Sequence, residues 1–245
     1  MLRTINELQG FAIQATDGEI GSIKDFYFDE ESWAIRYIVV DTGRWLPGRK
    51  VLLSPHTMGY VDRDDETLSA DLTKAEIEES PPVYVEKPLS QQLEGELHQY
   101  YGWPYYWAGR NAATVLPPNM TRKEKNIQLA DPQLRSSQAI IGYHIHATDG
   151  DIGHVEDFLL DDQEWFIRYM IVDTRNWLPG RKVLVALNWI EKFSFEEQMA
   201  QINLTKQKIE ASPEYDPDLR VERAYEASLH DYYVRSAYWL AKEPF

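Results

Sequence analysis

"DTGRWLPGRKVLL" occupies residues 41–53, and "DTRNWLPGRKVLV" occupies residues 173–185. The two stretches lie 132 residues apart, and this offset holds without a gap from Leu2 and Leu134 to the end of the chain. About 40 of the roughly 110 paired positions are identical. Collinear identity at so long a period indicates a duplicated domain, because solenoid repeats are much shorter.

The duplication predicts three parts in the chain. Residues 1–107 form the first repeat, residues 108–133 a linker, and residues 134–245 the second repeat. The linker is predicted from its polar residues, its Pro117-Pro118 pair and its lack of apolar periodicity.

Turn formers alternate with apolar and β-branched stretches in each repeat. Asp17-Gly18 separates two apolar stretches and predicts a hairpin. Residues 33–41, WAIRYIVVD, carry apolar side chains on both faces, which predicts a central strand. Leu46-Pro47-Gly48 predicts the turn into the next strand.

Helical signals follow the strands. Thr73 and Glu76 have the spacing of a capping box, whereas the second repeat keeps Thr205 but has Lys208 in place of the carboxylate. Farther on, apolar residues recur at helical spacing, at Leu89, Leu93, Leu97 and Tyr100 and again at Val221, Tyr225, Leu229 and Tyr232. The predicted fold class is therefore mainly β, with two small β-barrels, each followed by an amphipathic helix and an aromatic tail.

These linked motifs resemble the PRC-barrel family, named for the cytoplasmic barrel of the photosynthetic reaction centre H subunit. The matching features are DGEIG, WAIRYIVVDT, WLPGRKVLL, LTKAEIEESP and the Tyr-rich tail, and they recur through nearly all of both repeats. The resemblance implies a small, strongly bent sheet that binds other macromolecules. The H subunit's transmembrane helix and the second domain of the bacterial ribosome-maturation factor have no counterpart here, so the resemblance implies a fold rather than a specific role.

Composition narrows the class of protein. The chain has 245 residues, no cysteine and a formal net charge of -15, which disfavours nucleic acid and anionic lipid as partners. It has no apolar stretch long enough to span a bilayer and no signal-peptide pattern at its start. We expect a cytoplasmic protein that binds no nucleic acid and does not insert into a membrane.

Four polar residues in the repeated strands are candidates for a structural role. Asp41 and Asp173 end a strand before a turn, where an aspartate commonly accepts hydrogen bonds from turn amides, although a catalytic pair is the alternative. Arg36 and Arg168 lie among apolar neighbours and need carboxylate partners. We expect ion pairs with Asp25 and Asp157 or with Asp41 and Asp173.

The histidines give weaker signals. His144 and His146 would share one face of a strand, a geometry that suits zinc, but the sequence shows no third ligand. We therefore expect no metal and no cofactor. His98 and His230 recur beside a Tyr-Tyr pair on the predicted helix, where packing or a hydrogen bond is the favoured role and a pH-sensitive contact is the alternative.

Aromatic residues are the candidates for a partner surface. Trp45 and Trp177 are predicted at hairpin tips, where packing alone explains a tryptophan poorly. The tail "YYGWPYYW" adds Trp103, Tyr105, Tyr106 and Trp107, which either cover the end of the barrel or contact a partner.

No catalytic motif repeats, so we expect a non-enzymatic binding or adaptor protein for an unknown protein partner. The two barrels would mimic a two-fold dimer within one chain, and the sequence leaves a further homodimer open. One alternative is a photosynthetic reaction-centre accessory or assembly protein. Another is a small-molecule sensor or a hydrolase that uses the cleft between the barrels.

Overall fold

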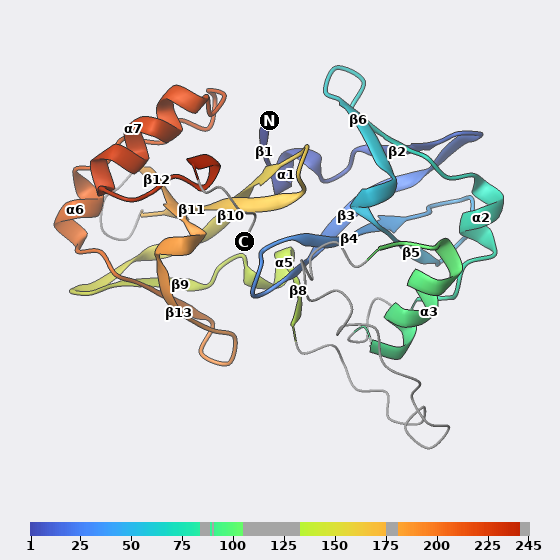
Figure 1. Ribbon diagram of the computed structural model, residues 1–245, viewed down its shortest axis with the longest axis horizontal. Helices are drawn as coiled ribbons and strands as arrows, with labels where there is room; N and C mark the ends of the chain where they lie inside the picture. The colour runs from blue at the N-terminus through green and yellow to red at the C-terminus, as the bar shows by residue number, and fades with distance from the viewer. Residues whose placement is uncertain (84–88, 90, 105–132, 175–180, 241–245) are drawn as a thin grey trace. The chain divides into compact units, whose positions relative to one another are not determined.

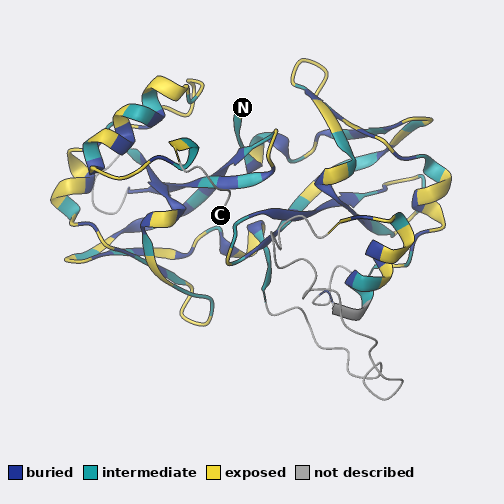
Figure 2. Cartoon of the chain, viewed as in Figure 1, coloured by how far each residue is buried: buried dark blue, intermediate teal, exposed yellow. Residues whose placement is uncertain are grey.

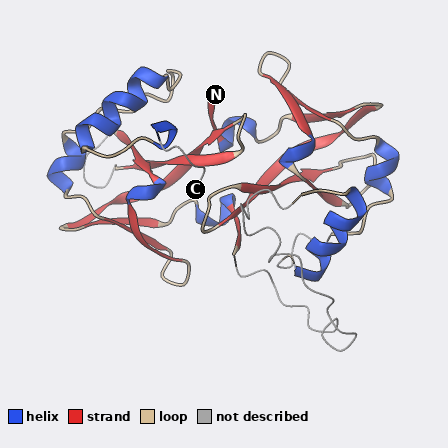
Figure 3. Cartoon of the chain, in the orientation of Figure 1, coloured by secondary structure: helices blue, strands red, loops and turns tan. Residues whose placement is uncertain are grey.

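The computed structural model describes residues 1–83, 89, 91–104, 133–174 and 181–240 (Figure 1). The chain forms two compact units. We call residues 8–136 the N-terminal unit, and residues 1–7 together with 137–245 the C-terminal unit. Each unit contains one seven-stranded sheet and a few helices, so the predicted mainly β class is confirmed (Figure 3). The predicted linker lies outside the described residues except for Gln133.

The N-terminal unit has the strand order β5-β4-β3-β2-β7-β6, with β8 paired to β3. The β2–β7 pair is parallel and the other pairs are antiparallel. A 3-10 helix, η1, joins the two end strands β5 and β6. The elements are β2 (Ala12–Ala15), β3 (Gly18–Asp29), β4 (Ile35–Asp41), β5 (Lys50–Leu53), η1 (Pro55–Thr57), β6 (Met58–Asp62), β7 (Thr67–Ala70), α2 (Lys74–Glu78), α3 (Gln91–Tyr101) and β8 (Leu134–Ser136).

The C-terminal unit repeats this order as β12-β11-β10-β9-β14-β13, with β1 paired to β10. The pair β9–β14 is again parallel. Its elements are β1 (Leu2–Thr4), α5 (Ser137–Ile140), β9 (His144–Ala147), β10 (Gly150–Asp161), β11 (Phe166–Asp173), β12 (Lys182–Ala186), η4 (Leu187–Trp189), β13 (Ile190–Ser194), β14 (Met199–Ile202), α6 (Lys206–Glu210), α7 (Arg223–Tyr233) and η5 (Tyr238–Leu240). A short helix, α1 (Ile5–Leu8), carries the chain from one unit into the other.

The strand β4 is central, as its sequence predicts. It lies between β3 and β5, and every residue from Ile35 to Val40 is buried (Figure 2). Burial on both faces accounts for the apolar residues on both faces, since each fully buried large apolar side chain stabilises the fold by about 1.5–3 kcal/mol. Trp33 precedes the strand rather than belonging to it, with φ 60, and its ring stacks on Phe28.

The repeated DG-x-IG motif joins the first hairpin to the rest of each unit. At Gly21, φ is +146, and a Cβ would lie 2.0 Å from the carbonyl oxygen of Asp41. Gly153 has the same close approach, at 1.8 Å, to the carbonyl of Asp173. Only glycine allows two backbones to approach so closely.

The aspartate of this motif caps a helix that is distant in sequence. Asp17 Oδ1 accepts a hydrogen bond from the backbone N–H of Lys74 at 2.8 Å, and Asp149 does the same for Lys206. These bonds satisfy an otherwise unpaired N–H in the first turn of α2 and of α6. The predicted capping box is also confirmed, because Thr73 and Glu76 exchange both of its bonds.

The first strand of each sequence repeat lies in the unit formed by the other repeat. In Figure 1, β1 runs beside β10 and β8 runs beside β3; the registers are Leu2 with Asp161 and Leu134 with Asp29. This differs from the predicted boundaries, which place residues 1–7 with the first repeat and residues 134–136 with the second. The C-terminal unit is therefore built from two segments that are distant in sequence, whereas the N-terminal unit is one continuous segment.

Two aspartates hold the exchanged strands. Asp157 accepts the backbone N–H of Asn6 at 3.2 Å, and Asp25 Oδ2 accepts the hydroxyl of Ser136 at 2.5 Å. Both aspartates follow register shifts in the long strands β10 and β3, which turn their side chains toward the added strand. Each long strand thus offers the added segment both a free edge and a carboxylate acceptor.

Candidate functional site

The hairpin between β4 and β5 carries Trp45, the first of the predicted partner-binding residues. Asp41 Oδ1 accepts the N–H of Gly43 at 2.9 Å, which confirms the predicted turn-capping role of this aspartate. The hydroxyl of Thr42 donates to the carbonyls of Leu46 and Arg49, at 2.8 and 2.6 Å. The backbone of the turn is therefore held from within.

Arg49 ties the same hairpin to α2. Its guanidinium donates to the carbonyls of Glu78 and Ser80, at 2.6 and 2.7 Å, just past the end of the helix. Arg181 makes the equivalent bonds to Glu210 and Ser212 in the C-terminal unit. A cation at a helix C-terminus satisfies carbonyls that lack helical partners. The aspartate, threonine and arginine of the repeated motif thus have structural roles, because they hold the turn in shape and attach it to the neighbouring helix.

The indole of Trp45 takes no part in the hydrogen bonds of Asp41, Thr42 and Arg49 that hold the hairpin. Trp45 is half-buried, and the ammonium of Lys74 lies 5.3 Å from the centre of its ring. Its neighbours Gly43, Arg44, Pro47 and Gly48 are exposed. A large rigid ring is therefore accessible on a turn whose shape does not depend on it. Its counterpart Trp177 lies outside the described residues.

The aromatic tail behaves differently from the hairpin. Trp103 is only 5% exposed, so its candidate role in a partner surface is wrong and the alternative, internal packing, holds. Its ring stacks on Tyr101 at 4.1 Å and meets the edge of His98 at 5.8 Å. Burying so large an apolar ring against α3 stabilises the unit more than exposing it would. Tyr105, Tyr106 and Trp107 lie outside the described residues.

Arg36 forms a buried ion pair, but with partners other than those expected. It contacts Glu94 of α3 and Asp29, the latter at 3.4 Å, rather than Asp25 or Asp41. The arginine is 3% exposed, so both carboxylates are needed to offset its loss of water. Asp25 is instead engaged by the exchanged strand β8.

A tyrosine, a glutamate and a histidine meet beneath α3. The hydroxyl of Tyr37 lies 2.6 Å from Glu94 Oε1 and 2.8 Å from His98 Nε2. Nδ1 of His98 lies 3.1 Å from the carbonyl oxygen of Trp103. Burial lowers the pKa of His98 to about 4, an effect that the charge of Arg36 reinforces. The imidazole is therefore neutral at pH 7, and it serves as a hydrogen-bonding core residue.

The C-terminal unit repeats this cluster with a different cation. Tyr169 lies 3.0 Å from Glu226 and 2.9 Å from Nε2 of His230. Arg223 supplies the positive charge, with its Nη1 3.0 Å from Glu226. Burial is the main cause that raises the pKa of Glu226 and lowers that of His230.

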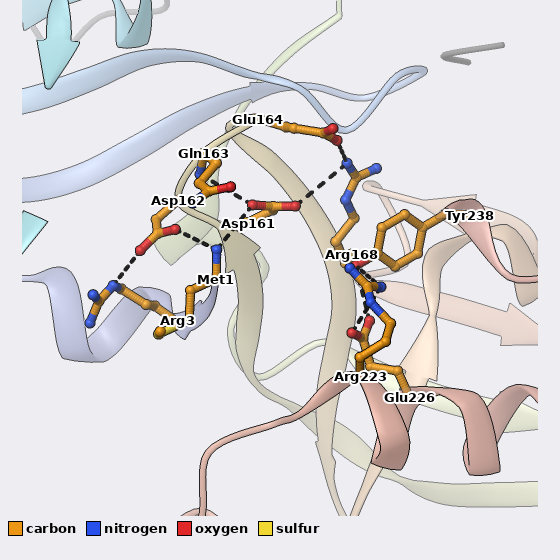
Figure 4. A network of polar contacts seen from close by, with 10 residues as sticks. All are labelled: Met1, Arg3, Asp161, Asp162, Gln163, Glu164, Arg168, Arg223, Glu226 and Tyr238. Carbon is orange, nitrogen blue, oxygen red and sulfur yellow. Dashed lines mark hydrogen bonds and ion pairs between the residues drawn. The ribbon is translucent and has the colours of Figure 1, made fainter. Parts of the chain in front are cut away.

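Arg168, the counterpart of Arg36, contacts a different set of groups. Figure 4 shows Arg168 directed toward Asp161 and Glu164, with the ring of Tyr238 beside it. The guanidinium lies 4.2 Å from the centre of that ring. Asp157 holds the exchanged N-terminal segment instead, so its predicted pairing with Arg168 is wrong. Asp173 is buried at the end of β11, as its predicted structural role requires.

Sequence reasoning missed the two buried glutamates. The face of α3 that packs inward contains Glu94, Leu97 and His98, and not only the leucines at helical spacing. A signal was present, because Glu94 and Glu226 are identical across the repeats and lie one turn before identical histidines. Glutamate is so rarely buried without a partner that a helical pattern alone places it in solvent.

The predicted His-x-His pair lies at the surface. His144 is exposed, and His146 Nδ1 lies 2.6 Å from Asp151 Oδ1. Among the residues that the structure describes, no three His, Asp or Glu side chains converge on one point as a metal would require. No helix within the same residues is long and apolar enough to cross a membrane.

The comparisons with known proteins bear on the first repeat. Residues 2–77 match the PRC-barrel domain family. A search of curated proteins finds no match to the chain. The matched residues include DGEIG, the central strand β4, the WLPGRKVLL segment and all but the last residue of the capped helix α2. The chain therefore carries a PRC-barrel domain at residues 2–77, and its second half repeats the same strand order.

Proposed function

We propose that this chain is a non-enzymatic binding protein that docks a protein partner on the hairpin bearing Trp45. The observation that carries the proposal is an accessible indole on a turn that other residues hold in shape. Tryptophan gives the largest apolar contact of any side chain and dominates the energetics of many protein interfaces. A preformed turn loses little conformational entropy on binding, which favours affinity.

The buried acids and bases support binding rather than catalysis. Glu94, His98 and Glu226 are all at most 4% exposed, and each contacts a tyrosine within its own unit. A general acid or base must reach the substrate proton within hydrogen-bond distance. Groups engaged in this way stabilise the contact between sheet and helix.

Charge supports a protein partner over nucleic acid. The formal net charge is -15, and binding to phosphate backbones needs clusters of Lys and Arg. We further propose a cytoplasmic location, and docking through the Trp45 hairpin itself requires no cofactor.

The test is affinity capture from the source cell lysate, with soluble and detergent-solubilised membrane fractions analysed separately. Wild type is compared with Trp45→Ala, Trp177→Ala and the double variant, and a captured protein is then purified for direct titration. We expect loss of a large apolar anchor to weaken binding by at least about tenfold, which corresponds to about 1.4 kcal/mol.

Tyr60→Ala is the matched control, because Tyr60 is 74% exposed on β6 of the same unit. It should leave binding unchanged if the hairpin is the docking surface. Equal affinity for wild type and the double tryptophan variant, with folding verified by circular dichroism, would rule out the proposed surface.

A further inference from the structure

Three histidines gather on the outer face of the sheet in the C-terminal unit. On β9, His144 and His146 alternate with the buried residues Ile145 and Ala147. Side chains alternate between the two faces of a strand, so both imidazoles point outward. The spacing between them along the strand is about 7 Å.

The sheet register supplies the ligand that the sequence did not show. His154 of β10 is the direct cross-strand partner of His144, and Asp151 is the partner of His146. Directly paired residues share one face of the sheet, with Cβ atoms about 4.5–5.5 Å apart. The three imidazoles therefore lie on the same face of two neighbouring strands, with Asp151 as the fourth member of the group.

A bulge in β10 is what brings the third histidine to this face. The register shifts between Asp151 and Gly153, so Ile152 is the extra residue, and it is fully buried. Without the extra residue, Asp151 and His154 would point to opposite faces, because three positions separate them. The bulge returns His154 to the outer face.

Asp151 already orients one imidazole. Its Oδ1 lies 2.6 Å from His146 Nδ1, which leaves Nε2 of the same ring available to a ligand. A carboxylate bound to one ring nitrogen is the usual second partner of a histidine that binds a metal through the other. This contact favours the tautomer that carries its proton on Nδ1 and directs the ring before any ion arrives.

We propose that His144, His146 and His154 bind one Zn²⁺ ion at the surface of the C-terminal unit, with Asp151 orienting His146. Three imidazoles with a solvent molecule in the fourth position form a recognised tetrahedral zinc site. As they stand, the three imidazoles do not converge on one point, so ion binding requires their side chains to rotate. Side chains at the surface rotate within nanoseconds, so such a rotation is accessible to the folded protein.

The first repeat provides a natural comparison. Its residues at these three positions are Ala12, Gln14 and Ser22, on strands with the same pairing. The same sheet therefore folds with none of the three histidines. The histidines of the proposed site therefore occur in the second repeat alone.

The experiment is a calorimetric titration of the full, tag-free chain with zinc chloride. Wild type should bind one equivalent. The variants His144→Ala, His146→Gln and His154→Ser introduce the residues of the first repeat, so they should fold. Each should weaken binding by at least about tenfold, since loss of an orienting partner alone typically costs about 10- to 100-fold.

Two controls distinguish specific binding at this site from non-specific binding of zinc to the acidic surface of the protein. His56→Ala removes another exposed histidine, on η1 of the N-terminal unit, and should leave the affinity unchanged. Cobalt(II) in place of zinc should give the visible absorption of a tetrahedral nitrogen-ligated ion in wild type but not in the triple variant. No saturable zinc binding by wild type, or equal binding by the triple variant, would overturn the proposal.

Discussion

Val234 ends α7 in a left-handed conformation, with φ 54, and is 85% exposed. A β-branched residue is strained there, because its Cβ crowds the backbone. The equivalent position in the first repeat is Gly102, with φ +68 at the end of α3. One repeat thus has the residue that this helix end requires, and the other does not.

We predict that Val234→Gly stabilises the C-terminal unit by about 1 kcal/mol, because relief of the strain outweighs the greater freedom of glycine in the unfolded chain. Urea denaturation followed by circular dichroism measures the change. Gly102→Val, the reciprocal substitution, should destabilise the N-terminal unit by a similar amount. A destabilising Val234→Gly would mean that the valine side chain makes a contact worth more than its strain.

At the scale of the element, the short helices α2 and α6 differ in one capping interaction. Thr73 donates through its backbone N–H and its hydroxyl to Glu76, at 2.8 and 2.7 Å. These bonds, the backbone bond first, lower the pKa of Glu76 below its ordinary value. In α6 the equivalent residue is Lys208, and only the bond from its N–H to Thr205 remains.

Lys208→Glu should complete the box in α6 and stabilise the C-terminal unit by about 0.5 kcal/mol at pH 7. A carboxylate with a lowered pKa in the folded state stabilises the fold above its unfolded pKa, and this contribution disappears as the pH falls through the folded pKa. The gain should therefore vanish in acid. Lys208→Gln is the control for loss of the lysine charge, and denaturation at pH 7 and pH 3 distinguishes the two variants.

Asp157 helps to attach the N-terminal segment, because it accepts the N–H of Asn6 just after β1. Burial raises the pKa of Asp157 to about 6, although the N–H groups of Phe158 and Asn6 oppose the shift. The raised value means that stability from this group is complete below its unfolded pKa, near 4, and is lost as the pH rises through about 6. The C-terminal unit should thus lose stability through this carboxyl as the pH rises from about 4 to about 6.

Asp157→Asn keeps an acceptor oxygen and removes this titration. Between pH 4 and pH 7, wild type should lose on the order of 2 kcal/mol relative to the variant. Urea denaturation across this range gives the difference directly. Parallel stability curves for the two proteins would show that the carboxyl titrates normally.

At the scale of the whole molecule, the exchange of first strands decides which parts of the chain depend on each other. Residues 1–7 begin the first repeat in sequence but complete the sheet of the C-terminal unit. Arg3 and the N-terminal amine both contact Asp162, each at 2.6 Å, as Figure 4 shows. In the N-terminal unit, Arg135 and Glu30 form the corresponding ion pair, at 2.7 Å.

Deletion of residues 1–7 should therefore destabilise the distant half of the chain. Hydrogen exchange read by mass spectrometry should show faster exchange at the edge of β10 near Leu159 and Asp161, which would lose its partner strand. The paired edge of β3 near Tyr27 and Asp29 should stay protected, because β8 still covers it. Faster exchange confined to β2 and β3 would indicate that β1 belongs to its own repeat in solution.

The sequence by itself determined the duplication, the central strand β4, the hairpin turns and the capped helices. These features depend on neighbours within a few residues, where periodicity, glycine, proline and capping residues act directly. Local sequence also predicted the turn-capping role of Asp41 and located the His-x-His pair. Only the tertiary structure decided which unit each first strand completes, because a free strand edge accepts any chain segment of matching register.

Long-range packing decided the remaining partners. Glu94 is buried because Arg36 and Tyr37, more than fifty residues earlier, come to lie against it. Trp103 turns inward because α3 offers it the rings of His98 and Tyr101. His154 comes opposite His144 only because one extra residue, Ile152, shifts the register of β10. Such pairings depend on the register of the sheet and on which buried charges can form ion pairs. Neither can be predicted from a local stretch of the chain.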